Sequence, residues 1–344
     1  MAKVNSFRRV TIREVAAQAG VSTQTVSRVV NGHPDVSDET RIRVQQVIAQ
    51  LRYRPSGVAR SLAARSSQML GVVAGGFHLF GPVQLLTGIE QQATDLGWHL
   101  MLQIVDSANP QDYERVAANL ISQNVAGVIW AYPELTGECE RAFLQQVRSY
   151  APVVFLSMEP CAGSAVINVD NRHGARLAAE HLIARGYRHI GIITGPLTLW
   201  SAQQRKLGWQ DALASAELPR HKRQIVEGDW TAAGGDAGLV KLLTQFPTLD
   251  AVFVSNDQMA LGALKAAERL GRRVPDDLGI VGFDDIPESG FFKPSLTTVH
   301  HDLIELGRIG VRELHRVIQL HHEGRPASTT SLVLQPWLVV RESA

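Results

Sequence analysis

Cysteine is scarce in this chain of 344 residues, and long apolar runs are missing. The two cysteines, Cys139 and Cys161, have neither CxxC spacing nor a histidine cluster nearby, which gives no support for a disulfide or a zinc site. No run of about eighteen apolar residues could span a bilayer, and residues 1–9 lack the apolar core of an export signal. We therefore expect a cytoplasmic protein without a membrane partner.

Motifs of catalysis are also missing. The sequence contains no GxSxG, GxGxxG, Walker A or HExxH pattern. The adjacent pairs His300-His301 and His321-His322 cannot share one helix face, which argues against metal binding. We expect no enzymatic activity, no catalytic residue, no metal and no cofactor.

Charge is distributed unevenly along the chain. The net charge is +1, but residues 1–65 contain eleven Lys or Arg against four Asp or Glu, which gives this segment +7 and leaves −6 for the remainder. A basic end on an acidic body is typical of a protein that places one end against phosphates. RNA or an anionic lipid surface would attract the same charge, so the geometry of the helices must distinguish DNA binding from these alternatives.

Three helix starts are visible in the basic segment. Thr11 and Glu14 have the offset of a capping box, which predicts a first short helix. Ser22 can cap a second helix over residues 23–30, and Ser37 can cap a third. Two short helices joined by a tight turn, with a third behind them, match the helix-turn-helix plan.

The second predicted helix has one apolar and one polar face. Val26, Val29 and Val30 have inward spacing, whereas the outward positions are all hydrogen-bonding residues: Thr23, Gln24, Ser27 and Arg28. In a major groove, Gln24 can pair with adenine and Arg28 with guanine. A polar face that is merely solvated is the ordinary alternative, but here the turn, the caps and the basic charge coincide.

Residues 56–65 form a segment that is too short for a stable isolated helix, so it is either a flexible linker or a helix that folds only with a partner.

From residue 69 the pattern changes to apolar runs that alternate with helical stretches. Continuous Val, Ile and Leu runs followed by helices indicate parallel sheets with both faces covered. The length allows two such halves, with crossings near residues 169–171, 300 and 332. Ligands of open parallel sheets bind beyond the carboxyl ends of the strands.

Polar residues suited to a sugar follow several of these runs. Arg205, Asn256 and Asp284 can pair with vicinal hydroxyls, and Trp230 can stack on the C–H face of a sugar. Each also has a structural interpretation: Asn256 as a helix cap, Asp284 as a turn former and Trp230 as a core residue.

The chain resembles the lactose-repressor and galactose-repressor (LacI/GalR) family over essentially its whole length. The resemblance lies in VTIREVAAQAGVSTQTVSRVVNGHPDVSDETRIRVQQVIAQLRYRPSGVARSLA and in SAQQRKLGWQDAL, EGDW, SNDQMALGALKA, GIVGFDD and PSLTTVHHDLIELG. It implies an α/β protein with an N-terminal helix-turn-helix headpiece and a periplasmic-binding-protein-like body of two subdomains, each a doubly wound parallel sheet. The implied parts are a headpiece at 1–54, a hinge helix and linker at 55–67, and a body at 68–344 for effector binding and dimerisation. Its subdomains are about 68–169 with 300–331, and about 170–299 with 332–344.

The resemblance also assigns roles to single residues. Leu62 in the hinge would be the apolar wedge in the minor groove. The other DNA-binding residues would be Thr11, Ser22, Thr23, Gln24, Thr25, Ser27, Arg28, Asn31, Ser37 and Tyr53. Effector-binding residues would be Leu79, Ser157, Ser201, Arg205, Trp230, Asn256, Asp284 and His301. Thr23, Ser157 and His301 depart from one member of the family, which has an aromatic, an acidic and an amide residue at these positions.

These features predict a repressor that binds a pseudo-palindromic duplex operator as a homodimer. A sugar-type inducer, such as a galactoside, would release it by favouring a body arrangement in which the hinge helices cannot pair. The alternatives are a regulator that needs a purine or another metabolite as corepressor, and a sugar-binding sensor or transport module. Because no heptad helix follows the last strand, we expect a dimer. Its predicted interface includes residues 82–96 and exposes Leu85, Leu86 and Ile89.

Overall fold

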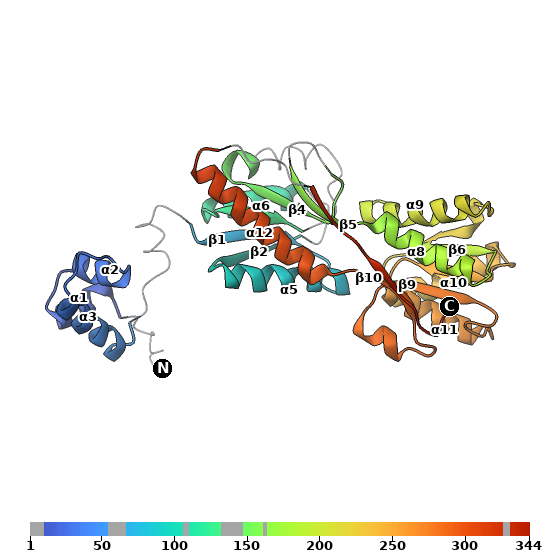
Figure 1. Ribbon diagram of the computed structural model, residues 1–344, viewed down its shortest axis with the longest axis horizontal. Helices are drawn as coiled ribbons and strands as arrows, with labels where there is room; N and C mark the ends of the chain where they lie inside the picture. Colours follow the sequence, from blue (N-terminus) through green and yellow to red (C-terminus); the bar gives the residue numbers. More distant parts are fainter. Residues whose placement is uncertain (1–9, 54–66, 106–109, 132–146, 161–163, 326–330) are drawn as a thin grey trace, which may run out of the picture. The chain divides into compact units, whose positions relative to one another are not determined.

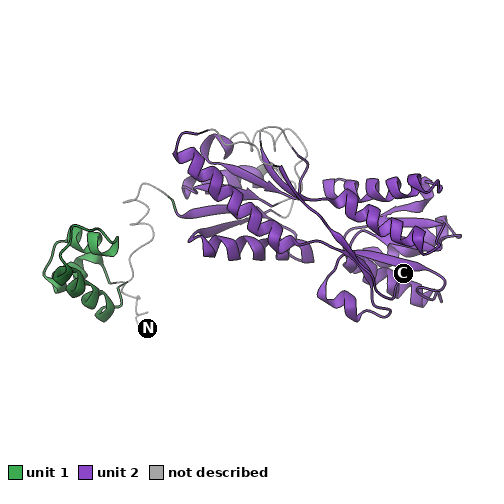
Figure 2. Ribbon diagram, viewed as in Figure 1, with its two compact units in different colours: residues 1–67 green, residues 68–344 purple. Residues whose placement is uncertain are grey.

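The computed structural model describes residues 10–53, 67–105, 110–131, 147–160, 164–325 and 331–344. The chain divides into two compact units, residues 1–67 and 68–344, which are described separately below (Figure 2). Most of the predicted hinge, including Leu62, lies outside the described residues, as do both cysteines.

Residues 10–53 of the N-terminal unit contain three helices: α1 (Ile12–Ala19), α2 (Thr23–Val30) and α3 (Asp38–Gln50). Their apolar faces meet in a small core in which Val15, Val26 and Val44 are fully buried. The predicted capping box is confirmed, because the Glu14 amide donates to Thr11 Oγ1 (3.4 Å) and the Thr11 amide to Glu14 Oε2 (2.7 Å).

The caps of the other two helices differ. The amide of Thr25 donates to Ser22 Oγ at 3.1 Å, which confirms the predicted cap of α2. The predicted side-chain cap at Ser37 is wrong: Ser37 stands at the N-cap position, but its hydroxyl donates to Thr40 Oγ1 at 2.9 Å. The carboxylates of Asp38 and Glu39 in the first turn favour the positive end of α3 instead.

The described strands of the C-terminal unit form two sheets (Figure 1). Each of these sheets has six strands. Every pair in the first sheet is parallel, in the order β11-β5-β4-β3-β1-β2. Its strands are β1 (Met69–Ala74), β2 (His99–Ile104), β3 (Gly127–Trp130), β4 (Val153–Leu156), β5 (Ala165–Val169) and β11 (Ser331–Leu334). Helices α5 (Phe80–Asp95) and α12 (Leu303–His322) share one apolar core with this sheet, and α6 (Pro110–Ser122) shares another.

The second sheet has the order β12-β10-β9-β8-β6-β7, in which only β10 and β12 are antiparallel. Its strands are β6 (Ile190–Thr194), β7 (Ile225–Glu227), β8 (Ala251–Val254), β9 (Gly279–Asp284), β10 (Thr297–His300) and β12 (Trp337–Val339). Two helix pairs form separate cores with it: α8 (Asn171–Ala184) with α9 (Trp200–Ser215), and α10 (Ala232–Gln245) with α11 (Asp257–Arg269). Two 3₁₀ turns, η1 (Lys222–Gln224) and η2 (Pro287–Phe291), complete this part.

Three crossings join the two sheets. The first lobe comprises residues 68–169 and 303–334, and the second lobe comprises residues 170–302 and 335–344. The last crossing lies later than the predicted residue 332, because Leu332 belongs to β11 and pairs with Ile167 of the first sheet. Each lobe therefore depends on chain segments that are far apart in the sequence.

The predicted exposure of the apolar residues of α5 is wrong. Leu85 and Ile89 were predicted to be exposed, but they are 5% and 0% exposed, and Leu86 packs against the same core. The reason is α12, which lies so close that a Cβ on Gly88 would stand 1.9 Å from the carbonyl oxygen of Ile304. The apolar face of α5 is therefore used inside the lobe.

Among the described helices, none is both long and apolar enough to cross a membrane.

Candidate functional site

A cavity of about 570 Å³ lies within the C-terminal unit, lined by residues of both lobes. Leu79, Pro82 and Ser157 come from the first lobe, and Gln258 and Asn171 are among those from the second. All eight residues predicted for the effector site line this one cavity: Leu79, Ser157, Ser201, Arg205, Trp230, Asn256, Asp284 and His301. Its volume is in the range of small-molecule sites.

Arg205 on α9 is the charged centre of the cavity and is only 6% exposed. Its Nε donates to Asn171 Oδ1 at 2.8 Å, and one terminal nitrogen donates to the Ser255 carbonyl and lies 3.6 Å from Asp284 Oδ1. The guanidinium carbon lies 3.6 Å from the centre of the Phe283 ring. Burial lowers the pKa of Arg205, although Asp284 and Asp257 act against this shift. These contacts fix the guanidinium plane at the cavity wall.

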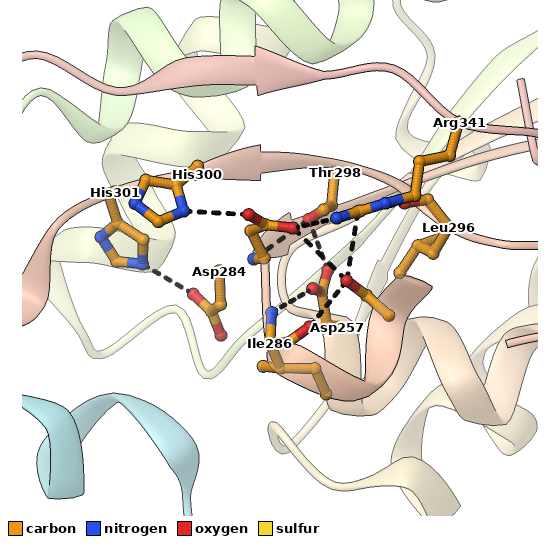
Figure 3. A network of polar contacts seen from close by, with 10 residues as sticks. Asp257, Asp284, Ile286, Leu296, Thr298, His300, His301 and Arg341 are labelled. Carbon is orange, nitrogen blue, oxygen red and sulfur yellow. Dashed lines mark hydrogen bonds and ion pairs between the residues drawn. The ribbon is translucent and has the colours of Figure 1, made fainter. Parts of the chain in front are cut away.

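Asp284 and His301 form a buried pair (Figure 3). Arg205 lies beside this pair. His301 Nε2 lies 3.0 Å from Asp284 Oδ1, and His301 is 7% exposed. Burial lowers the pKa of His301 more than the neighbouring carboxylate raises it, which favours the neutral ring at pH 7. A neutral ring can then hold its proton on Nε2 and donate it to Asp284. Asp284 in turn has a free oxygen for a ligand hydroxyl.

The lowered pKa of His301 predicts a pH-dependent stability. Folding favours the neutral ring, so its contribution is present above the ordinary pKa of 6.5 and is lost as the pH falls through and below that value. We expect His301→Gln to remove part of the stability loss between pH 7 and pH 5, a slope of at most about 1.4 kcal/mol per pH unit. Thermal unfolding at several pH values measures this. His322→Gln, at an exposed histidine, is the control; identical pH slopes for wild type and His301→Gln would contradict the assignment.

A second carboxylate network is formed around Asp257, close to Asp284 (Figure 3). Asp257 accepts hydrogen bonds from Thr298 Oγ1 at 2.6 Å and from the Ile286 amide at 3.0 Å. Burial, and then the charge of Asp284, raise the pKa of Asp257 well above its ordinary value. Burial acts to raise the pKa of Asp285 as well, but hydrogen bonds from Arg341 and His300 outweigh it and lower that pKa. This network holds the chain after β9 in place.

Three non-glycine residues that line the cavity have positive φ angles. Ser157, Trp230 and Asp284 have φ angles of 58°, 70° and 114°, which side chains other than glycine adopt at a cost. Trp230 is held in this conformation from two sides. Its carbonyl accepts from Asn256 Nδ2 at 3.0 Å, and its ring lies where a Cβ on Gly195 would come within 2.0 Å. Such strain is common at ligand sites.

Asn256 has the structural role that the sequence also allowed. Its Oδ1 accepts from the Met259 amide at 3.0 Å and thereby caps α11. Asn171 and Gln258 line the same cavity but were not predicted. Asn171 follows the carboxyl end of β5, so the strand-end rule could have found it. No local signal marks Gln258.

The N-terminal unit presents the polar face of α2 to solvent. Thr23, Gln24 and Arg28 are exposed, whereas Val26 and Val29 are buried. Several other predicted DNA-contact residues have internal partners: Thr11 and Ser22 in caps, Thr25 with Ser22, Asn31 with Ser27, Ser37 with Thr40, and Tyr53 against the core. Arg41, for which no role was predicted from the sequence, also has an internal partner, because its guanidinium donates to the His33 carbonyl at 2.7 Å. The described residues contain no cluster of three or more His, Cys, Asp or Glu that could hold a metal.

A three-helix unit with a polar exposed second helix, joined to a two-lobed body with a ligand-sized cavity, defines the class of ligand-controlled DNA-binding regulators. Residues 11–56 match the bacterial regulatory proteins of the lacI family, and residues 179–344 match a periplasmic binding protein-like domain. The chain is 35% identical to the lactose operon repressor of Escherichia coli (strain K12) over 90% of this chain and 85% of the repressor. It is 33% identical to the transcriptional repressor PurR of Haemophilus influenzae (strain PittEE), over 97% and 98% of the two chains.

Solved structures show the same similarity. A Lac repressor dimer bound to operator and the anti-inducer ONPF matches with a TM-score of 0.90 and 34% identity, over 98% of this chain and 99% of that chain. A complex of the regulator CelR with cellobiose matches with a TM-score of 0.73 and 30% identity, over 98% and 100%. This chain belongs to the LacI family of bacterial regulatory proteins. The predicted family, the fold class and the function as a helix-turn-helix transcription repressor are thereby confirmed.

Proposed function

We propose that the protein is a homodimeric repressor that leaves its operator when an uncharged sugar binds in the cavity. The observation that supports this most is the composition of the cavity wall. Among the described lining residues, Arg205 is the one Arg or Lys, and two of its nitrogens already donate to Asn171 Oδ1 and to the Ser255 carbonyl. Asp229 and Asp284 supply two carboxylates, in each of which Oδ1 accepts a hydrogen bond from the protein. Carboxylates accept hydrogen bonds from sugar hydroxyls but repel phosphate, and Trp230 offers an aromatic face.

The headpiece would be residues 1–54, with Gln24 and Arg28 as base readers and residues 55–67 as the hinge. The body would be residues 68–344. An operator-binding repressor acts where the genome lies, so we place the protein in the cytoplasm, without enzymatic activity. The similarity to PurR keeps a purine corepressor as the second candidate.

The Lac repressor with a similar structure was solved as a dimer, and apolar side chains left exposed on the first lobe of this chain offer a face for a second copy. Leu102 and Ile104 are 38% and 44% exposed on β2, an edge strand, and Val83 is 40% exposed on α5. An exposed apolar edge strand is a ready surface for association. We expect Ile104→Lys to shift the protein towards monomer in sedimentation velocity, because a buried charge opposes the apolar contact. A variant that stays fully dimeric would exclude this face.

Selection of duplexes from a random-sequence library by the full-length protein tests DNA binding. We expect affinity for the selected duplex to fall by roughly a thousandfold or more between 50 and 200 mM salt, because phosphate contacts release counterions. A response that is flat with salt would contradict phosphate-led binding. An unenriched library would contradict the proposal as a whole.

A thermal-shift screen then tests the effector class. Lactose, ribose, cellobiose, glucose 6-phosphate and hypoxanthine are suitable probes, and each ligand that raises the melting temperature is added to the protein–duplex complex. An inducer weakens the complex and a corepressor strengthens it, since linkage works in opposite directions. Stabilisation by glucose 6-phosphate alone would contradict an uncharged effector.

A further inference from the structure

The N-terminus of α5 is completed by a side chain of the other lobe. Leu79, at the N-cap position, provides no side-chain acceptor, and Pro82 in the first turn has no N–H. The amide of Phe80 instead donates to Gln258 Oε1 at 3.3 Å. A helix of the first lobe is thus capped by a residue of the second.

Gln258 is not needed for this purpose in its own helix. It is the second residue of α11, whose N-terminus is already capped by Asn256. Among the described residues, and apart from the three crossings, the bond from Phe80 to Gln258 is the only side-chain hydrogen bond between the two lobes. Its two residues are 178 positions apart in the sequence.

The bond also lies at the wall of the cavity. Gln258 lines it, and so do Leu79 and Gly81 on either side of Phe80. A ligand that fills the cavity therefore contacts both sides of this bond. Because the bond is long and only partly buried, a small change in lobe orientation is enough to break it.

We propose that Gln258 couples occupancy of the cavity to the relative orientation of the lobes. This inference rests on the proposed function. The relative that matches with a TM-score of 0.90 was solved on its operator, so we assign the bond to the DNA-binding arrangement. A ligand that separates Gln258 from the α5 amide then releases the lobes. One such hydrogen bond shifts the equilibrium between lobe orientations by roughly fivefold per protomer.

Three variants test the bond from both ends. Gln258→Leu keeps the size of the side chain and removes the acceptor, whereas Gln258→Glu keeps an acceptor oxygen. Phe80→Pro removes the donor at the first helical position, where proline is tolerated. The residue before it, Leu79, already has φ −104° and ψ 152°, as a residue before proline requires.

Hydrogen exchange of the α5 N-terminal amides is the first measurement, and it needs neither DNA nor effector. We expect faster exchange at Phe80 in Gln258→Leu and exchange at the wild-type rate in Gln258→Glu. The second measurement is affinity for the library-selected duplex. We expect Gln258→Leu and Phe80→Pro each to weaken it about fivefold or more, and the double variant to be no weaker than either single one.

Failure of the proposed function and failure of the role of Gln258 give different results. If wild type selects no duplex, the proposed function fails, while hydrogen exchange still decides whether the bond exists. If Gln258→Leu leaves exchange unchanged, or tightens duplex binding, the coupling role of Gln258 is overturned. Effects of the two single variants that multiply in the double variant would also overturn it, because two independent defects would then be present.

Discussion

Replacing Arg205 with alanine is expected to abolish the response to effector and to leave duplex binding almost unchanged. The guanidinium presents fixed donors at the cavity wall and compensates the buried carboxylate of Asp284. In the proposed site, its removal would eliminate charged hydrogen bonds to the effector, and it leaves that carboxylate with His301 alone. Truncating one charged partner of a buried hydrogen bond to a ligand costs about 2–5 kcal/mol, so we expect effector affinity to fall at least about thirtyfold.

Duplex binding should survive because the N-terminal unit has a core of its own. Titration of the protein–duplex complex with the sugar found by thermal shift measures both properties. Arg205→Lys keeps the charge but loses the planar fork, so its response should lie between those of wild type and Arg205→Ala. An intermediate response of Arg205→Lys would also show that the response to effector is not lost through unfolding, and circular dichroism would detect such unfolding.

Arg172→Ala is the matched control for this experiment. Arg172 lies on α8 of the same lobe and pairs with Asp211 of α9, and the two side chains are 52% and 38% exposed. The Asp211 hydrogen bond, and then its charge, raise the pKa of Arg172, yet an exposed pair contributes little to stability. The control should respond to effector as wild type does. An Arg205→Ala protein that responds at the wild-type effector concentration would remove Arg205 from the site.

The sequence predicted features that are local along the chain. The caps at Thr11 and Ser22 follow from neighbours within three residues, and continuous apolar strands indicated covered parallel sheets. The residues predicted for an effector site also line one cavity, since the carboxyl ends of parallel strands face the same edge.

Features that depend on distant segments could not be predicted in this way. Leu85 and Ile89 are buried because α12, more than two hundred residues later, covers α5. Gln258 has no local signal, since its partner is a backbone amide of the other lobe. Ser37 shows a different limit: a residue can occupy the cap position while its hydroxyl bonds a neighbouring side chain.

Replacing Arg28 with alanine is expected to weaken binding to the selected duplex by about 1–3 kcal/mol, which is roughly 5- to 150-fold, and to weaken binding to random duplex far less. The position of the side chain explains the difference. Val26 and Val29 are held in the core, so α2 must present Gln24 and Arg28 to solvent, one helical turn apart. A guanidinium there can donate to both acceptors on the guanine edge.

Two further variants separate base reading from simple attraction to phosphates. Arg28→Lys keeps the charge and loses the bidentate fork, so it should keep the affinity for random duplex and lose most of the preference for the selected one. Arg43→Ala removes an exposed charge from α3 and should weaken both duplexes by the same factor. Competition binding with the two duplexes at one salt concentration measures the ratio. If Arg28→Ala lowers both affinities equally, Arg28 contacts phosphate, and base recognition must come from Thr23, Gln24 or Ser27.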